Sequence, residues 1–200
     1  KLGSAADIRP IGAAATQVFQ HWQTAGLLPQ ISEQSVALLA TAILDNTLNF
    51  TGQMTTAADI EAYAELAPLA KLSPDWPEQY FLECQANIEA NLTGALAADL
   101  KRMRPESNLP QVFAQMTVWD ADALLHKHRP TFSRWMAGQG DDWLLNVIGI
   151  RDRKSCLLAE STLTQQKLNN LLSLDWQVGI AVLKPSILRK ELLKLGLTAS

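Results

Sequence analysis

The chemistry open to this chain has to come from charged side chains spread along it, because the sequence contains none of the compact catalytic motifs. It has no G-x-x-x-x-G-K-[ST] phosphate loop, no G-x-G-x-x-G turn, no H-E-x-x-H zinc motif and no G-x-S-x-G nucleophile turn. The three histidines, His21, His126 and His128, fall on polar helix faces without a neighbouring set of ligands. Such histidines are more often surface side chains than metal ligands or bases.

Acidic and basic side chains are divided unequally between the two halves of the chain. Residues 1–100 carry three Lys and Arg against eleven Asp and Glu, a balance of −8, whereas residues 101–200 carry fourteen against nine, a balance of +5. Opposed fields in one cleft can concentrate a cation and a phosphate together, so this division suits a metal-holding lobe that faces an anion-holding lobe. An uneven scatter of solvated surface charge is the alternative.

Length and composition predict a globular chain. Of its 200 residues 48% are hydrophobic, which suffices for one large domain or two small ones. Cys84 and Cys156 lie far apart without C-x-x-C spacing, so neither a disulfide framework nor a zinc ribbon is indicated. No run approaches the roughly 18 apolar residues of a membrane span, and no signal-peptide pattern opens the chain. We therefore expect a cytoplasmic protein that does not bind membranes.

The first part of the chain is predicted to be helical. An amphipathic helix is expected over 13–25. Ser32 can cap a second helix whose apolar run 36–44 is expected to be buried on every side. Thr56 and Asp59 have the spacing of a capping box that opens a third helix. The apolar stripe of this third helix is expected at Ile60, Tyr63, Ala64 and Ala67.

Helix-breaking residues concentrate at 71–77, and we place the boundary between two domains there, at 1–72 and 73–200. A helix that reaches about residue 92 is expected next, with Pro77 inside its first turn. From residue 110 the apolar residues recur with a period of two, which predicts a strand. The remaining segments predict a helix at 120–137, a hairpin of strands at 143–150 and 156–159, a helix at 162–173 and a strand at 178–183. This order predicts an α/β fold class, with a helical part followed by a mixed sheet covered by helices.

Three segments of the first half resemble consecutive motifs of one family. Residues 9–16 (R-P-I-G-A-A-A-T) resemble the P-[VI]-G-x-[TA]-A-T stretch that follows the DHH signature in family II, manganese-dependent pyrophosphatases and their exopolyphosphatase and prune-type relatives. Residues 42–50 (A-I-L-D-N-T-L-N-F) resemble the family's last metal-site motif, and residues 55–59 (T-T-A-A-D) resemble its T-x-T-x-x-D segment. The resemblance implies that 1–72 is the C-terminal part of a DHH metal-binding domain and 73–200 a DHH-associated substrate-binding domain.

The resemblance implies a metal ligand near the end of the second predicted helix. Counted back from Phe50, the family's ligating Asp falls on Asn46, while Asp45 lies one residue earlier, about 100° around a helix. Either Asp45 binds the metal after a local shift of register, which we favour, or Asn46 is a neutral and weaker ligand. The family's D-x-D pair, its upstream histidine and its DHH signature are missing from this chain, so we expect the chain alone to be inactive.

Two segments of the second half resemble phosphate-contacting motifs of the same family. Ala98-Asp99-Leu100-Lys101 resembles a D-x-K segment whose lysine contacts phosphate, and Leu188-Arg189-Lys190 resembles an S-R-K segment. The resemblance implies that Lys101, Arg189 and Lys190 are the catalytic and substrate-binding residues. An arginine fork can bind two phosphate oxygens, and a lysine supplies a compact charge. Taken singly, each is more simply a solvated charge, and the order of the motifs favours the functional interpretation.

For the intact protein the resemblance implies two Mn²⁺ or Mg²⁺ ions that activate a water, with the cations of the second domain offsetting charge on the transferred phosphoryl group. The implied activity is hydrolysis of a phosphoanhydride, pyrophosphate or short polyphosphate, and a nucleotide substrate stays open. The alternative is a catalytically silent DHH relative whose second domain binds an anion or a protein. The expected partner is a small phosphate-containing anion, and a homodimer is compatible with the sequence, which carries no strong nucleic-acid signal.

Overall fold

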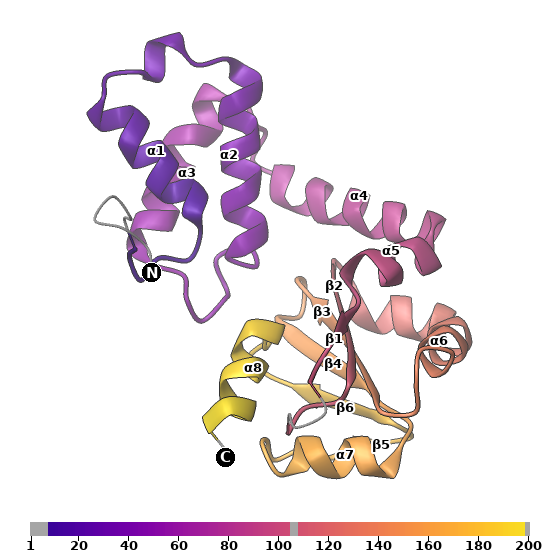
Figure 1. The fold of residues 1–200 in the computed structure, drawn as a ribbon. Coiled ribbons are helices and arrows are strands. Elements are labelled where there is room, and N and C mark those ends of the chain that lie inside the picture. The colour runs from indigo at the N-terminus through magenta and orange to yellow at the C-terminus, as the bar shows by residue number, and fades with distance from the viewer. Residues whose placement is uncertain (1–7, 105–107, 199–200) are drawn as a thin grey trace. The chain divides into compact units, whose positions relative to one another are not determined.

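The computed structural model describes residues 8–104 and 108–198, and the chain divides into two compact units, Lys1–Pro77 and Glu78–Ser200 (Figure 1). The N-terminal unit is helical, and the C-terminal unit combines a mixed sheet with helices. The α/β fold class predicted from the sequence is therefore confirmed. The division between the units falls at the end of the segment 71–77, in which helix-breaking residues concentrate.

In residues 8–77, the described part of the N-terminal unit, there are three complete helices and one short 3-10 turn. As predicted, the Ser32 hydroxyl caps the second helix by accepting a hydrogen bond from the Ser35 amide at 3.1 Å, and Thr56 and Asp59 form the capping box of the third. The elements are α1 (Ala14–Thr24), η1 (Leu28–Gln30), α2 (Glu33–Asn46) and α3 (Ala57–Leu69). Their shared core contains Ala13, Phe19, Val36, Ala40, Ile43, Ala62, Leu66 and Ala70.

Two predictions about the inner faces of these helices are wrong. The apolar run of α2 is not buried on every side, since Leu38 is 65% exposed and only the face toward α1 and α3 joins the core. The inner face of α3 carries Asp59, Ala62 and Leu66, whereas Ile60 of the predicted stripe is 50% exposed. A pattern search that counts apolar residues alone misplaces this face, because its first buried residue is a carboxylate.

Among the described residues of the C-terminal unit, six strands form one sheet with the order β1-β2-β3-β4-β6-β5. Strands β2 and β3 are parallel, joined by a crossover through α6, and all other neighbouring pairs are antiparallel. The strands are β1 (Lys101–Arg102), β2 (Val112–Val118), β3 (Trp143–Gly149), β4 (Lys154–Leu158), β5 (Trp176–Gln177) and β6 (Ile180–Leu183). The helices are α4 (Trp76–Ala90), α5 (Leu92–Asp99), α6 (Ala121–Ala137), α7 (Thr162–Asn169) and α8 (Arg189–Thr198).

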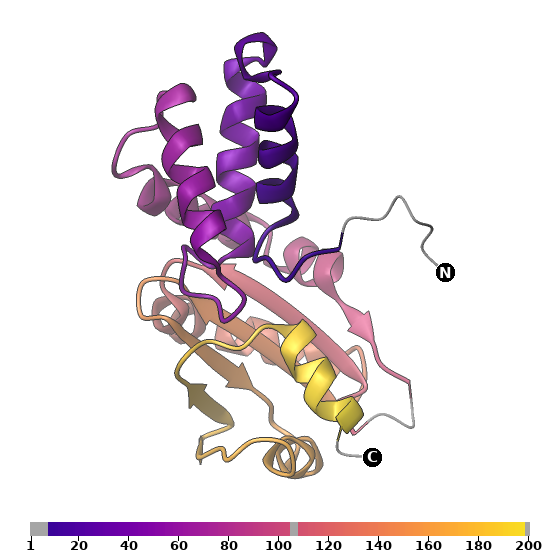
Figure 2. The same cartoon turned by 90° about the vertical axis from the view of Figure 1, so that its left-hand side faces the viewer.

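Helices cover both faces of this sheet, as Figure 1 and Figure 2 show. On one face α5 and α6 pack over the side chains of β2, β3 and β4. On the other face α8 and the residues around α7 cover a second apolar cluster that includes Phe113, Leu144 and Leu157. Every residue of β3 is buried for this reason, which explains its nearly continuous apolar sequence. Among the described residues no helix is long and apolar enough to cross a membrane.

The predicted strand and hairpin are present, and β3 and β4 pair antiparallel. Strand β4 begins at Lys154, two residues earlier than predicted, because Lys154 pairs with Gly149. The strand expected from residue 178 begins later, at Ile180. Val178 and Gly179 have φ angles of 50° and 75° and form the two-residue turn that joins β5 to β6. Positive φ at both positions is typical of a tight hairpin turn.

Candidate functional site

The two candidate metal ligands lie at the C-terminal end of α2, and both Asp45 and Asn46 are exposed. The Asn46 side-chain nitrogen donates a hydrogen bond to the carbonyl of Ala42 at 2.9 Å, so part of its amide is engaged with its own helix. Asp45 supplies the carboxylate of the pair. The helix end also favours a cation, because the last carbonyls of a helix carry partial negative charge and the last turn of α2 has no basic residue.

A left-handed turn stops α2 directly after these residues. Leu48, Asn49 and Phe50 have φ angles of 51°, 53° and 62°, a conformation that costs free energy for residues other than glycine. Surrounding contacts hold the turn in place, since the Thr47 hydroxyl accepts a hydrogen bond from the Phe50 amide at 3.1 Å and Leu48 is only 2% exposed. The Phe50 ring also packs edge-on against Tyr63, with 5.3 Å between centroids. The turn therefore ends α2 directly after Asn46 and fixes the position of Asp45 in the last turn of the helix.

A buried carboxylate joins the other two motif-like segments of the N-terminal unit. Asp59 is 0% exposed and accepts hydrogen bonds from the Gly12 amide at 3.0 Å, the Ala13 amide at 3.1 Å and the Thr16 hydroxyl at 2.6 Å. It also accepts from the amide and the hydroxyl of Thr56, both at 2.8 Å. We call these five residues the Asp59 hub. The hub brings residues 9–16 and 55–59 together, although they are distant in sequence.

Burial raises the pKa of Asp59, but the hydrogen bonds from Thr16, Thr56 and Gly12 outweigh it, so the pKa lies below its usual value of 3.8. The carboxylate is therefore ionised at neutral pH and is stabilised by dipoles alone. Gly12 has to be a glycine here, because a Cβ atom at this position would lie 2.8 Å from Oδ2 of Asp59. The hub acts as a structural anchor rather than as an open ligand set.

The residues of the N-terminal unit do not by themselves fit a two-metal centre. Within its described part, residues 8–77, no three His, Cys, Asp or Glu side chains gather closely enough to hold an ion together. Asp59 already accepts five hydrogen bonds within the hub, so Asp45 and Asn46 are the candidate metal ligands that remain. A two-metal centre needs several hard ligands. Further ligands would have to join these two from outside the described residues.

The three predicted phosphate-binding cations all lie in the C-terminal unit. Lys101 is exposed on the edge strand β1, Lys190 is exposed in the first turn of α8, and the Arg189 side chain is 18% exposed. Lys101 is the register partner of Phe113, and the guanidinium of Arg189 lies 5.7 Å from the centre of the Phe113 ring. Because opposite residues of antiparallel strands project from the same face, Lys101 and Arg189 share one face of the sheet. The structure therefore brings the segments 98–101 and 188–190 together.

The guanidinium of Arg189 is bound end-on by Asp99, a contact that the sequence did not predict. Nη1 donates to Oδ2 at 2.5 Å and to the Asp99 carbonyl at 3.0 Å, while Nη2 donates to Oδ1 at 3.0 Å. Oδ2 of Asp99 also accepts the Gln115 amide at 2.7 Å, and the Gln115 side-chain oxygen accepts the Arg189 amide at 2.6 Å. Asp99, Gln115 and Arg189 form a closed ring of hydrogen bonds, which we call the Asp99 ring.

Two buried polar residues hold the segment that leads into α8. Asn146 in β3 donates to the Ile187 carbonyl at 2.7 Å. The Ser155 hydroxyl in β4 accepts from the Ile187 amide at 3.0 Å and donates to the Ile187 carbonyl at 3.2 Å. Both polar side chains are 0% exposed within otherwise apolar strands. Polar residues inside buried strands were the signal in the sequence that could have revealed this support.

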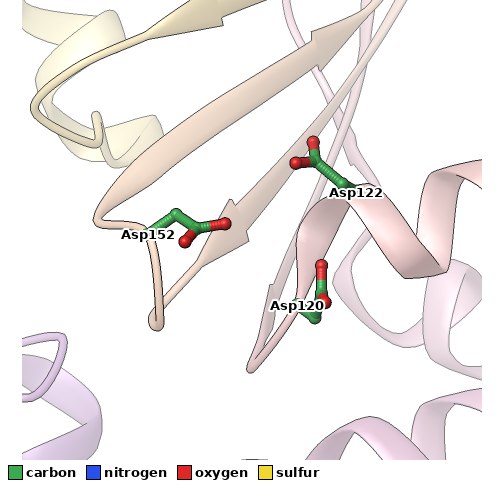
Figure 3. Close-up of side chains that lie close together, drawn as sticks. All are labelled: Asp120, Asp122 and Asp152. Atoms are coloured by element: carbon green, nitrogen blue, oxygen red, sulfur yellow. The ribbon is translucent and has the colours of Figure 1, made fainter.

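A cluster of three carboxylates lies elsewhere in the C-terminal unit, where Asp120, Asp122 and Asp152 approach one another (Figure 3). Their oxygens lie within 4.8 Å of one another, a spacing that could hold a metal ion. Arg151 pairs with Asp120 at 2.7 Å and with Asp152 at 3.4 Å, and Lys154 pairs with Asp122 and, at 3.6 Å, with Asp152. Protein cations thus already offset most of this charge, and the cluster is an ion-pair network in the structure.

The histidines take no part in these groupings. His21 and His126 are exposed. His128 lies 3.2 Å from Glu89, which also pairs with Lys127 at 2.5 Å. Hydrogen bonding from Lys127, with smaller contributions from Gln85 and His128, lowers the pKa of Glu89 to about 2. This group is an ion-pair cluster that links α4 to α6.

Comparison with known proteins supplies a fold and no family assignment. No protein-family model and no curated protein matches the chain. Among solved structures, the chain is similar to a protein of Methanococcus jannaschii provisionally assigned as a family II inorganic pyrophosphatase, with a TM-score of 0.75 and 16% sequence identity, over 99% of this chain and 69% of that one. The two proteins share a fold. The identity is too low for the likeness to the pyrophosphatase to carry individual residues across.

A second solved structure is an exopolyphosphatase-related protein from Bacteroides fragilis, with a TM-score of 0.37 and 12% identity over 95% of this chain and 56% of that one. A likeness at that score carries no argument. The pyrophosphatase-like fold therefore rests on the first comparison, together with the mixed sheet and helices described above.

Proposed function

We propose that this chain contributes to metal-dependent hydrolysis of a phosphoanhydride, with pyrophosphate or a short polyphosphate as substrate. In this proposal the N-terminal unit is the C-terminal part of a DHH metal-binding domain, and the C-terminal unit is the DHH-associated domain that binds the substrate. The observation that carries the proposal is the gathering of the segments 98–101 and 188–190 on one face of the sheet. A fold shared with a pyrophosphatase-like protein supports it.

The C-terminal unit has the features of a polyanion site. Lys101 and Lys190 are exposed, so their ammonium groups can follow the oxygens of a phosphate chain. Arg189 begins α8, where the Glu191 carboxylate accepts the Leu188 amide at 2.7 Å, so the positive charge at this place comes from the side chains of Lys101, Arg189 and Lys190. Together these groups would hold the substrate and offset charge that develops on the transferred phosphoryl group. A small multiply charged phosphate is the ligand that such a cluster fits best.

Metal ions enter the proposal for the intact protein only. Two Mn²⁺ or Mg²⁺ ions would supply an activated water there, with Asp45, or else Asn46, among their ligands. Since the described residues of the N-terminal unit do not complete such a centre, we assign this chain the binding and charge-offsetting part of the reaction. We expect the chain alone to bind pyrophosphate without hydrolysing it.

A catalytically silent relative that binds an anion is the second candidate. Asn46 stands where a ligating carboxylate is expected, and its amide is engaged with Ala42. Both candidates share the small phosphate-containing partner, and a cytoplasmic location and a homodimer remain parts of the proposal.

The test is a titration of the 200-residue chain with pyrophosphate by calorimetry, followed by phosphate-release assays with Mn²⁺. The double variant Lys101→Gln/Lys190→Gln should bind pyrophosphate about tenfold more weakly. The double variant Arg134→Gln/Arg153→Gln removes the same charge from two other exposed positions and should bind nearly as well as the wild type. Equal affinity of both double variants would refute the assigned site. Full hydrolysis by the isolated chain would refute the assignment of a binding role alone.

A further inference from the structure

We propose that Asp99 is a positioning residue, whose carboxylate fixes Arg189 and thereby sets Lys101 and Lys190 in place for a ligand with two linked phosphates. This inference rests on the proposed function and extends it to a residue that does not itself contact the substrate. It follows from the Asp99 ring, which ties the two cationic segments to each other and to the sheet.

The ring holds Arg189 at both ends. Its backbone amide is bound by the Gln115 side chain at 2.6 Å, and its guanidinium is bound by both oxygens of Asp99, at 2.5 and 3.0 Å. The Cζ atom of the guanidinium lies over the Phe113 ring, 5.7 Å from its centre. A side chain held in this way has little rotamer freedom left to lose when a ligand binds.

Asp99 is itself anchored to the sheet. Strand β1 pairs with β2 only opposite Val112 and Phe113, so the next outward amide along β2 lacks a strand partner. Oδ2 of Asp99 accepts that amide, from Gln115, at 2.7 Å. The carboxylate therefore has a fixed location relative to β2, and it transmits that location to Arg189.

The consequence concerns the two lysines. Lys101 follows Asp99 by two residues and Lys190 follows Arg189 directly, so the contact between Asp99 and Arg189 ties their two backbones together. Much of the Arg189 fork is engaged by Asp99, so of the three predicted cations Lys101 and Lys190, which are exposed, are the more accessible to a ligand. A diphosphate that spans both lysines needs their separation to be fixed, whereas a single phosphate does not.

Coulomb's law and the positioning role predict opposite changes in pyrophosphate affinity when the charge of Asp99 is removed. A carboxylate beside a cationic site repels anions, so its simple neutralisation should strengthen phosphate binding. Loss of a positioning group should instead weaken binding of the ligand that spans both lysines. The variant Asp99→Asn keeps the shape of the side chain while it removes the charge, and it separates the two effects.

The experiment measures the dissociation constants of pyrophosphate and orthophosphate for the 200-residue chain by calorimetry at one ionic strength. Asp99→Asn should weaken pyrophosphate binding about tenfold, as is usual for residues that orient a binding group, and should change orthophosphate binding less than twofold. Asp175→Asn makes the same charge change next to β5, at the opposite edge of the sheet, and should leave both constants within twofold. Gln115→Met removes the acceptor for the Arg189 amide without a change in charge and should also weaken pyrophosphate binding selectively.

Thermal unfolding of each variant identifies any that do not fold. If Asp99→Asn does not fold, pyrophosphate binding by Gln115→Met tests the positioning role in its place. Pyrophosphate binding that is unchanged or stronger in the folded variants overturns the positioning role and leaves the proposed function standing. Equal weakening of pyrophosphate and orthophosphate overturns it as well, because a general loss of the site would have that effect. A wild-type chain that binds neither phosphate overturns the proposed function and this inference together.

Discussion

Asp59 in the N-terminal unit and Asp99 in the C-terminal unit both join segments that are far apart in sequence, and the two carboxylates are held in different ways. Asp59 is fully buried and is satisfied by amides and hydroxyls, without a cation. Asp99 is 35% exposed at its side chain and is satisfied by the guanidinium of Arg189 and one amide. Only Asp99 therefore has a charged side chain as its partner.

The difference indicates that Asp59 and Asp99 have different roles. A buried carboxylate held by fixed dipoles has no exposed partner to exchange, so the Asp59 hub stabilises the fold. A partly exposed ion pair adds less stability, because solvent and salt weaken it and each partner could be solvated instead. The Asp99 ring is therefore expected to contribute mainly to the arrangement of the cations around it. The following predictions test this contrast in order of expected size.

The largest effect is expected from Asp59→Asn. The side-chain amide nitrogen would replace one carboxylate oxygen and set its N–H donors against the backbone amides of Gly12 and Thr56, or against that of Ala13. The free energy of unfolding of the N-terminal unit should therefore fall by about 3 kcal/mol. Urea denaturation at neutral pH, combined with hydrogen exchange of peptides from α1 and α3, measures the loss and locates it. Glu61→Gln, at an exposed carboxylate of the same helix, is the matched control and should change stability by less than about 0.5 kcal/mol.

A smaller loss, about 2 kcal/mol, is expected from Gly12→Ala, because the new Cβ would press on Oδ2 of Asp59 from 2.8 Å. The loss of stability caused by Gly12→Ala should be coupled to the loss caused by Asp59→Asn. In the double variant Gly12→Ala/Asp59→Asn the total loss should be clearly less than the sum of the two, since both substitutions disrupt the same hub. Simple additivity in urea denaturation would show that Gly12 is required for a reason other than the carboxylate.

Asp99→Asn should lower the stability of the C-terminal unit by only about 1 kcal/mol, although the Asp99 side chain accepts three hydrogen bonds. Faster hydrogen exchange should be confined to the residues around β1, Gln115 and the start of α8. A loss as large as that of Asp59→Asn would remove the contrast between the two aspartates. Raising the salt concentration should narrow the gap between this variant and the wild type, and should not do so for Asp59→Asn.

Moderate acidification should have the smallest effect. The pKa of Asp59 is lower in the folded chain than its usual 3.8, so its contribution to stability is complete above about that pH and is lost as the pH falls toward the folded value. Between pH 7 and pH 4 the loss due to this group should not exceed about 0.3 kcal/mol. The measurement is the difference in unfolding free energy between the wild type and Asp59→Asn across this range. A gap that widens as the pH falls would contradict the lowered pKa.

The elements of the fold could be predicted from the sequence to a large extent. The capping residues Ser32, Thr56 and Asp59 predict where α2 and α3 begin, and the change of apolar period at residue 110 predicts where the sheet begins. These signals are local, because a cap or a strand is decided by residues close in sequence. The inner face of α3 could not be predicted in the same way, since the donors that allow Asp59 to be buried lie in another segment.

The candidate site could be predicted only in part, for the same reason. The resemblance of two short motifs indicates Lys101, Arg189 and Lys190, and their roles are proposals. The partner of Arg189 was not foreseen, although Asp99 belongs to the same short motif as Lys101, because a pairing across 90 residues leaves no local pattern. Which of Asp45 and Asn46 faces a metal depends on ligands that the described residues do not contain.

The sheet of the C-terminal unit ends on both sides in a strand of two residues, β1 and β5. A long bare strand edge invites open-ended stacking of one molecule on another. Here one edge consists of Lys101 and Arg102, and Asp99 occupies the next backbone donor, from Gln115. Recruitment of a further copy along this edge is therefore discouraged, and a dimer of the chain would be expected to close through side-chain surfaces into a finite assembly rather than to grow into a fibre.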